Sequence, residues 1–84
     1  MDSVGKQEFS GAQVLDITTE TCPMTFVRTR LALDRLTTGQ LLLVRLRGDE
    51  PRRNIPHTAT EQGHGVLAQH DLPDGTTELL LRKG

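Results

Sequence analysis

Tryptophan and tyrosine are absent from this 84-residue sequence, and Phe9 and Phe26 are its only aromatic residues. Because proteins hold single-stranded nucleic acids largely by stacking bases on aromatic side chains, direct nucleic-acid binding is not expected. An excess of charge of one sign is also missing, since 10 basic and 11 acidic residues leave a net charge of −1. The composition therefore gives no sign of attraction to an anionic membrane surface.

Long apolar runs are missing as well, because no stretch approaches the roughly 20 residues that span a bilayer. The N-terminus is polar and does not resemble a signal peptide. Cys22 is the only cysteine, so no disulfide can form within the chain. A free thiol suits a reducing compartment. We therefore expect no membrane association and a cytoplasmic location.

Metal-binding and hydrolytic motifs are not found. His57, His64 and His70 are the only histidines, and no pair formed among them and Cys22 has a structural-zinc spacing. We interpret the histidines as solvated polar residues. No Ser-His-Asp set and no pair of carboxylates is readable. The sequence therefore predicts neither a metal nor another cofactor.

Hydrophobic periodicity predicts one small domain over residues 12–84, preceded by a flexible tail over residues 1–11. The predicted elements are strand 12–18, helix 23–36 with a stop at Gly39, strand 40–47, turn 48–51, a helix capped by Asn54 and reaching about residue 62, strand 66–70, turn 72–75 and strand 76–82. This order predicts an α/β (α+β) two-layer sandwich, β-α-β-α-β-β. Its four-stranded mixed sheet carries two helices on one face.

The first predicted helix has apolar residues on two sides. At 100° per residue, one side carries the residues that we assign to the core: Phe26, Leu33 and Leu36. Met24, Val27 and Leu31 share the opposite side, starting one turn from Cys22. They either pack on the second helix or form an exposed docking surface for a partner that must reach the thiol.

Cys22 comes directly before Pro23, at the start of this helix. Proline is tolerated at the first helical position, because the N–H that it lacks has no partner there. Cys22 is therefore predicted at the N-cap, where free backbone N–H groups and the helix dipole favour a thiolate. The alternative is a buried cysteine that serves only as a small hydrophobic residue.

Arg28 lies about one and a half turns beyond Cys22. It belongs to a basic middle section that contains Arg28, Arg30, Arg45, Arg47, Arg52 and Arg53. One interpretation is a patch near the thiol that recruits an acidic partner and favours the thiolate. The other is a solvated face of scattered charges.

An ordered set of short motifs runs from about residue 14 to residue 82. It comprises Leu15-Asp16-Ile17, Cys22-Pro23, Gly39, a leucine-rich strand, Asp49-x-Pro51, Ile55-Pro56 and Gly63-His64. With these spacings the chain resembles the TusA/SirA-like sulfur-carrier family. The resemblance implies a two-layer sandwich in which Cys22 carries sulfur as a persulfide, with Pro23 starting the helix. The sulfur would come from a cysteine desulfurase or rhodanese-like donor and pass to an acceptor protein.

Two positions depart from the family pattern. Thr25 replaces the second proline of the usual Cys-Pro-x-Pro motif, and Thr18-Thr19 replaces the common Arg-Gly. Thr25 keeps the N–H that proline lacks and adds a hydroxyl, and both could donate to a sulfur anion. We therefore expect that the cysteine site of the family is retained and that its hydrogen-bond donors are adjusted to a different sulfur donor or acceptor.

The favoured hypothesis is a cytoplasmic sulfur carrier without a cofactor. Because a second cysteine is lacking, a persulfide on Cys22 cannot resolve as an internal disulfide and waits for a partner. One alternative is a non-catalytic interaction or regulatory module. Another is a redox or selenium-handling relative that uses the same cysteine.

Overall fold

The computed structural model describes residues 12–84, and the predicted tail over residues 1–11 lies outside this range. The elements are β1 (Ala12–Asp16), α2 (Met24–Asp34), β2 (Leu41–Arg47), α3 (Asp49–Glu61), β3 (Gly65–Asp71) and β4 (Thr76–Arg82). Their order, β-α-β-α-β-β, confirms the predicted succession. No helix within residues 12–84 is long and apolar enough to cross a bilayer.

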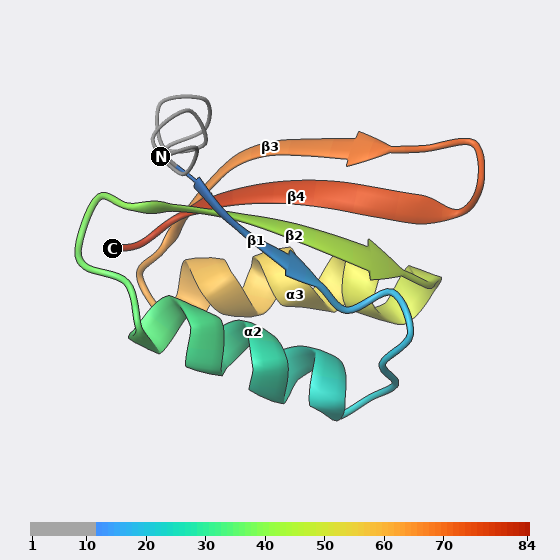
Figure 1. The fold of residues 1–84 in the computed structure, drawn as a ribbon, viewed down its shortest axis with the longest axis horizontal. Coiled ribbons are helices and arrows are strands. Elements are labelled where there is room, and N and C mark those ends of the chain that lie inside the picture. Colours follow the sequence, from blue (N-terminus) through green and yellow to red (C-terminus); the bar gives the residue numbers. More distant parts are fainter. Residues whose placement is uncertain (1–11) are drawn as a thin grey trace, which may run out of the picture.

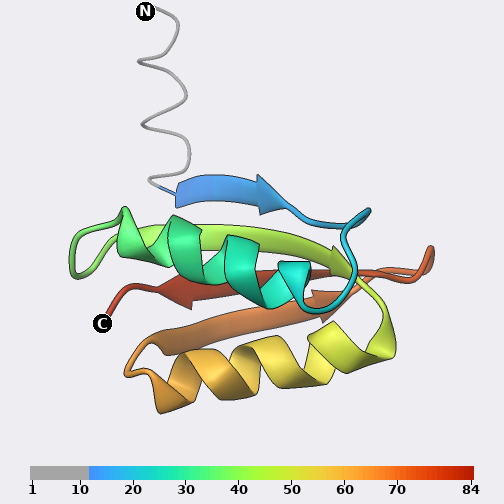
Figure 2. The same ribbon diagram turned by 90° about the horizontal axis from the view of Figure 1, so that it is seen from below.

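The strands form one four-stranded sheet in the order β1-β2-β4-β3. β1 and β2 are parallel, whereas β4 is antiparallel to both β2 and β3. Parallel neighbours need a crossover connection, and α2 provides it. Both helices lie on one face of the sheet, as Figures 1 and 2 show from two directions. The predicted two-layer sandwich with a mixed sheet is therefore confirmed.

The core lies between the sheet and the helices. Alternation along the central strands decides which residues enter it, because successive strand side chains point to opposite faces. Leu79 and Leu81 of β4 are fully buried. The other buried hydrophobic residues are Ile17, Leu33, Leu36, Leu42, Val44, Leu46, Ile55 and Ala59. Phe26 is partly buried against this cluster, and Leu15 joins it from the edge strand.

The second helix begins earlier than predicted. α3 starts at Asp49, directly after Gly48, so Asn54 lies inside the helix and is not its cap. The segment 48–51 was predicted as a turn because it contains Pro51. In the structure Pro51 lies in the first helical turn, where the N–H that proline lacks would have no helical partner. Asp49 and Glu50 in that turn also interact favourably with the positive end of the helix dipole.

The first helix is shorter than predicted. α2 ends at Asp34 with Arg35 as its C-cap, so Gly39 does not terminate it. Gly39 has φ +94° in the loop before β2, and its N–H donates to the Lys83 carbonyl at 2.8 Å. The glycine therefore serves a turn that ties this loop to the chain end beyond β4.

Candidate functional site

Cys22 lies on the loop that joins the carboxyl end of β1 to α2, and it is exposed. The alternative in which Cys22 is a buried packing residue is therefore wrong. The loop turns back at its start, where the Glu20 N–H donates to the Ile17 carbonyl at 3.1 Å. A second turn follows, in which the Met24 N–H donates to the Thr21 carbonyl at 2.7 Å. Cys22 is the second residue of this turn, and it is exposed.

The N-cap of α2 is Pro23, one residue later than predicted. The Pro23 carbonyl accepts the N–H groups of Phe26 at 3.0 Å and Val27 at 3.1 Å, which is the position that an N-cap carbonyl takes. The Cys22–Pro23 peptide bond is cis. Because Pro23 is the cap, Cys22 precedes the cap and does not occupy it.

The first-turn amides of α2 are mostly engaged. Those of Met24 and Phe26 already have backbone acceptors. Within residues 12–84, the Thr25 N–H meets no backbone acceptor. The first N–H groups of a helix can ordinarily bind an anion. Near Cys22, the Thr25 N–H is the one that has no backbone acceptor within the described residues.

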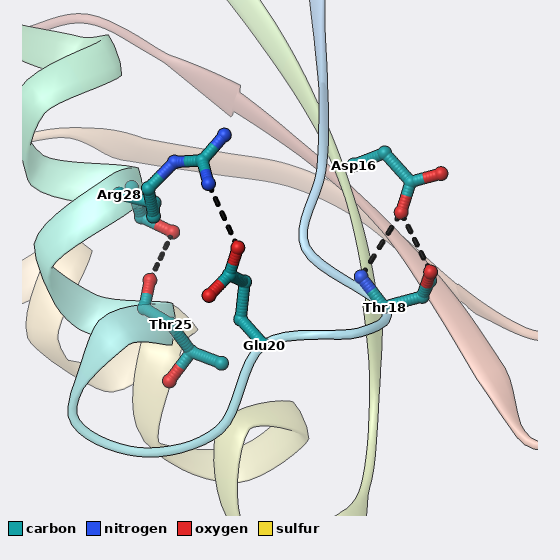
Figure 3. Close-up of polar contacts among 6 residues, drawn as sticks. Asp16, Thr18, Glu20, Thr25 and Arg28 are labelled. Atoms are coloured by element: carbon teal, nitrogen blue, oxygen red, sulfur yellow. Dashed lines mark hydrogen bonds and ion pairs between the residues drawn. The ribbon is translucent and has the colours of Figure 1, made fainter.

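Thr25 is buried, with only 2% of its surface exposed. Its Oγ1 has no hydrogen-bond partner within the described part of the chain. Thr29, one turn later, donates from its own Oγ1 to the Thr25 carbonyl at 2.8 Å. Figure 3 shows the Thr25 side chain turned into the bend that the loop makes between Glu20 and the helix. A buried hydroxyl without a partner is costly, so Thr25 is a residue that needs an explanation.

Arg28 is paired with Glu20. Its Nη1 lies 2.8 Å from Glu20 Oε2, as Figure 3 shows, and joins α2 to the loop that carries Cys22. The predicted role of Arg28 was to favour a thiolate. Because Glu20 lies on the same loop as Cys22, it compensates much of that positive charge.

The six arginines of the basic middle section do not form one surface. Arg45 and Arg47 belong to β2, and Arg52 and Arg53 belong to α3. Arg52 is within ion-pair distance of both Asp49 and Asp71. The structure therefore favours the interpretation of scattered charges over a single patch beside the thiol.

The loop is also held at its start. The Asp16 carboxylate accepts hydrogen bonds from the Thr18 N–H at 2.9 Å and the Thr18 hydroxyl at 2.7 Å. These bonds, the backbone one first, lower the pKa of Asp16 below its usual 3.8. Thr18, where the family pattern has arginine, thus fixes the exit from β1 (Figure 3). Sequence reasoning missed this contact, although aspartate two residues before threonine is a common turn signal.

Met24, Val27 and Leu31 are 41%, 42% and 51% exposed, respectively. The structure thus supports the exposed alternative and not full packing on the second helix. Val27 also lines a groove of about 190 Å³ between α2 and α3, with Phe26, Arg30, Ile55, Thr58 and Gln62 among the other lining residues. Sites for drug-sized ligands usually exceed about 300 Å³, so this groove fits a side chain of another protein better than a cofactor.

The histidines lie apart from Cys22. His57 pairs with Glu61 at 3.2 Å along α3, and His64 Nδ1 accepts the Gly84 N–H at 3.0 Å. Burial lowers the pKa of His64 below its usual 6.5. Within residues 12–84, no three His, Cys, Asp or Glu side chains gather in a position to hold a metal ion.

Known proteins resemble the chain over nearly all of its described length. Residues 13–83 match the protein family described as "Sulfurtransferase TusA". An Archaeoglobus fulgidus protein named "Putative sulfur carrier protein" is 30% identical over 77 residues, covering 92% of this chain and 88% of that protein. An Escherichia coli protein named "Putative sulfur carrier protein TsuB" is 25% identical over 69 residues, covering 82% and 92%.

The fold itself recurs in a solved structure. The crystal structure of the SirA-like protein from Desulfitobacterium hafniense matches with a TM-score of 0.75 and 24% sequence identity. The match covers 84% of this chain and 96% of that one. The family resemblance and the fold inferred from the sequence are both confirmed.

Proposed function

Because the chain belongs to the TusA sulfurtransferase family, we propose that it is a sulfur carrier whose Cys22 holds sulfane sulfur as a persulfide. The observation that carries this proposal is the exposure of Cys22 on a loop before a helix start. A thiol that exchanges sulfur between two proteins must be reachable by both. A single exposed cysteine meets this need and has no second thiol to divert it.

The reaction is a transfer between sulfur atoms with no net oxidation. The Cys22 thiolate attacks the outer sulfur of a donor persulfide, and the donor leaves as a thiolate when its S–S bond breaks. Cys22 then carries the outer sulfur as Cys–S–SH. A nucleophile on the acceptor protein attacks that sulfur, the new S–S bond breaks, and the Cys22 thiolate is restored.

The neighbouring residues support this chemistry in separate ways. Pro23 caps the helix, and the Thr25 N–H and hydroxyl, which have no partner within the described residues, are donors for a persulfide anion. Arg28 holds Glu20 and thereby fixes the loop that carries Cys22. We assign Cys22 the catalytic role, and Pro23, Thr25 and Arg28 supporting roles.

The donor is a cysteine desulfurase or a rhodanese-like protein, and the acceptor is a second protein, with both transfers in the cytoplasm. Each partner must contact the surface around Cys22. Met24, Val27 and Leu31 supply an exposed apolar surface on the outer side of α2, beginning next to the thiol. We assign these residues to partner binding.

The test is intact mass after incubation with a cysteine desulfurase, its pyridoxal cofactor and cysteine, for the wild-type chain and for Cys22→Ser. The expected result is the addition of one sulfur atom to the wild type only, removed by a reductant. The matched measurement is the alkylation rate of Cys22. No addition together with a thiol that alkylates slowly would overturn the proposal and favour a non-catalytic interaction module.

A redox or selenium-handling role for the same cysteine is the other alternative, and the same mass measurement distinguishes it when selenocysteine is supplied in a parallel incubation. A redox role predicts a mixed disulfide in place of a persulfide. A selenium role predicts loading from selenocysteine in preference to cysteine. Either product has a different mass from a single added sulfur.

A further inference from the structure

A row of charged and polar side chains crosses the sheet face that is turned away from the helices. Register pairing places Asp16 beside Arg45, Arg45 beside Glu78, and Glu78 beside His70, with one residue from each strand in the order β1-β2-β4-β3. Arg45 Nε and Glu78 Oε2 lie 3.7 Å apart at the centre of the row. The row therefore alternates acid, base, acid, imidazole across the sheet.

An apolar row lies next to the charged row on the same face. The register aligns Val14, Leu43, Leu80 and Ala68 across the strands. Val14 is 64% exposed, and Leu43 and Leu80 are only partly buried. Figure 1 shows both helices on one side of the sheet, and no helix or strand within residues 12–84 lies on the other side, which carries this apolar row.

Arg45 is incompletely satisfied on this face. Its Nε is shielded from solvent and has no hydrogen-bond partner within the described residues. The side chain as a whole remains 42% exposed. The Arg45 side chain is therefore accessible, at the centre of the face, to a molecule that packs on it.

We propose that this face binds a second copy of the chain, so that the two sheets pack face to face. The two-fold axis lies between the two sheets and runs parallel to the strands, above the line that separates β2 from β4. Rotation about that axis reverses the strand order and leaves the position along each strand unchanged. Arg45 then faces Glu78 of the second copy, and Glu78 faces its Arg45. Such self-complementarity is what a two-fold interface requires.

The remaining positions also match under this rotation. Leu43 faces Leu80 of the second copy, and Val14 faces its Ala68. At the rim, Asp16 faces His70 of the second copy, which can donate a hydrogen bond even when the imidazole is neutral. The strands of two aligned sheets cross at about −30°. This crossing angle displaces the central pairs least, because they lie nearest to the two-fold axis.

The size of the face predicts a weak dimer. Four strands about 4.8 Å apart, one of five and three of seven residues, at about 3.3 Å per residue, present roughly 400 Å² of projected face per copy. That is at the low end of specific interfaces, so dimerisation should depend on concentration in the micromolar range. The helices lie on the far side of both sheets, so both Cys22 thiols stay accessible in the dimer.

The test is sedimentation equilibrium of the full chain over a series of concentrations up to about 1 mM, followed by peptide absorbance because tryptophan and tyrosine are absent. Arg45→Glu places like charges opposite each other at the axis. The double variant Arg45→Glu/Glu78→Arg restores the complementary arrangement both within and between copies. Arg53→Glu makes the same charge change at an exposed position of α3, outside the face, and is the matched control.

The expected result is a mass rising toward twice 9.3 kDa for the wild type, the double variant and the control. Arg45→Glu should weaken association at least tenfold, with unchanged circular dichroism. A wild type that stays monomeric throughout, or an Arg45→Glu variant that associates as well as wild type, would overturn the proposal. Persulfide loading of Cys22 does not depend on this face, so the dimer and the sulfur-carrier role stand or fall separately.

Discussion

Arg28 and Glu20 form an ion pair of 2.8 Å between the second turn of α2 and the loop that presents Cys22. The pair joins the two ends of the segment 20–28 that contains Cys22, and both side chains are partly exposed, at 43% and 27%. Exposed pairs contribute little to stability, usually below about 1 kcal/mol. The pair therefore matters because it joins the loop that carries Cys22 to α2, and because Glu20 compensates the positive charge of Arg28.

Removing the acid of this pair should make the thiol more reactive. Glu20→Gln leaves Arg28 uncompensated beside Cys22, and a nearby cation favours the thiolate. We expect the alkylation rate at pH 7 to rise about two- to threefold. Glu61→Gln, which removes a pair on α3 instead, is the control. An unchanged or lower rate in Glu20→Gln would show that Arg28 does not influence the thiol.

Replacing the buried Thr25 by valine should stabilise the fold. Valine keeps the branched shape but removes an Oγ1 that has no partner, so the gain should be about 1 kcal/mol. Thr29→Val is the matched change, and it should destabilise by about 1 kcal/mol because it loses the bond to the Thr25 carbonyl. Urea unfolding followed by circular dichroism measures both. A destabilised Thr25→Val would mean that the hydroxyl does have a partner.

Restoring the second proline of the family motif should slow sulfur transfer. Thr25→Pro removes both the N–H and the hydroxyl while proline remains acceptable in a first helical turn. We expect persulfide loading to slow several-fold while the thermal midpoint changes little. Loading is measured by intact mass over time, with Thr25→Val separating the hydroxyl from the N–H. If Thr25→Pro loads and transfers at the wild-type rate, Thr25 does not tune the site.

A charge on the outer side of α2 should weaken partner binding without changing the thiol. Leu31→Asp places a carboxylate on the apolar surface that we assign to the donor and acceptor. Leu67→Asp is a matched control, because Leu67 on β3 is 52% exposed and Leu31 is 51% exposed. We expect the KM for the donor to rise about tenfold in Leu31→Asp only. Equal effects of the two variants would argue against a docking surface on α2.

The contribution of Asp16 to stability should depend on pH. Its pKa is lowered in the folded state by the Thr18 N–H and then by the Thr18 hydroxyl. The ionised carboxylate therefore favours folding at neutral pH, and this contribution is lost as the pH falls below 3.8 through the folded value. Asp16→Asn should lower the urea midpoint at pH 7, and the difference from wild type should shrink progressively as the pH is lowered below 3.8. A constant difference across this range would contradict the assignment.

Local patterns in the sequence were enough to predict the order of the elements. The alternation along β2 and β4 identifies Leu42, Val44, Leu79 and Leu81 as inward residues, because the strand repeat of two is read directly from neighbours. The Cys22-Pro23 pair likewise marks the start of a helix to within one residue. The start of α3 differs from the sequence prediction because Pro51, which can end a helix, is equally compatible with the first turn of one.

The place of Cys22 before a helix and the family pattern depend on the order and spacing of residues, so the sequence alone determined them, whereas the structure was needed to show that Cys22 is exposed. Only the tertiary structure decided that Glu20 neutralises Arg28, that the Thr25 hydroxyl is buried without a partner, and that Asp16, Arg45, Glu78 and His70 form one row. Each of these depends on the register or packing of segments far apart in the chain. Such contacts arise from the simultaneous burial of the whole core and leave no local periodicity to read.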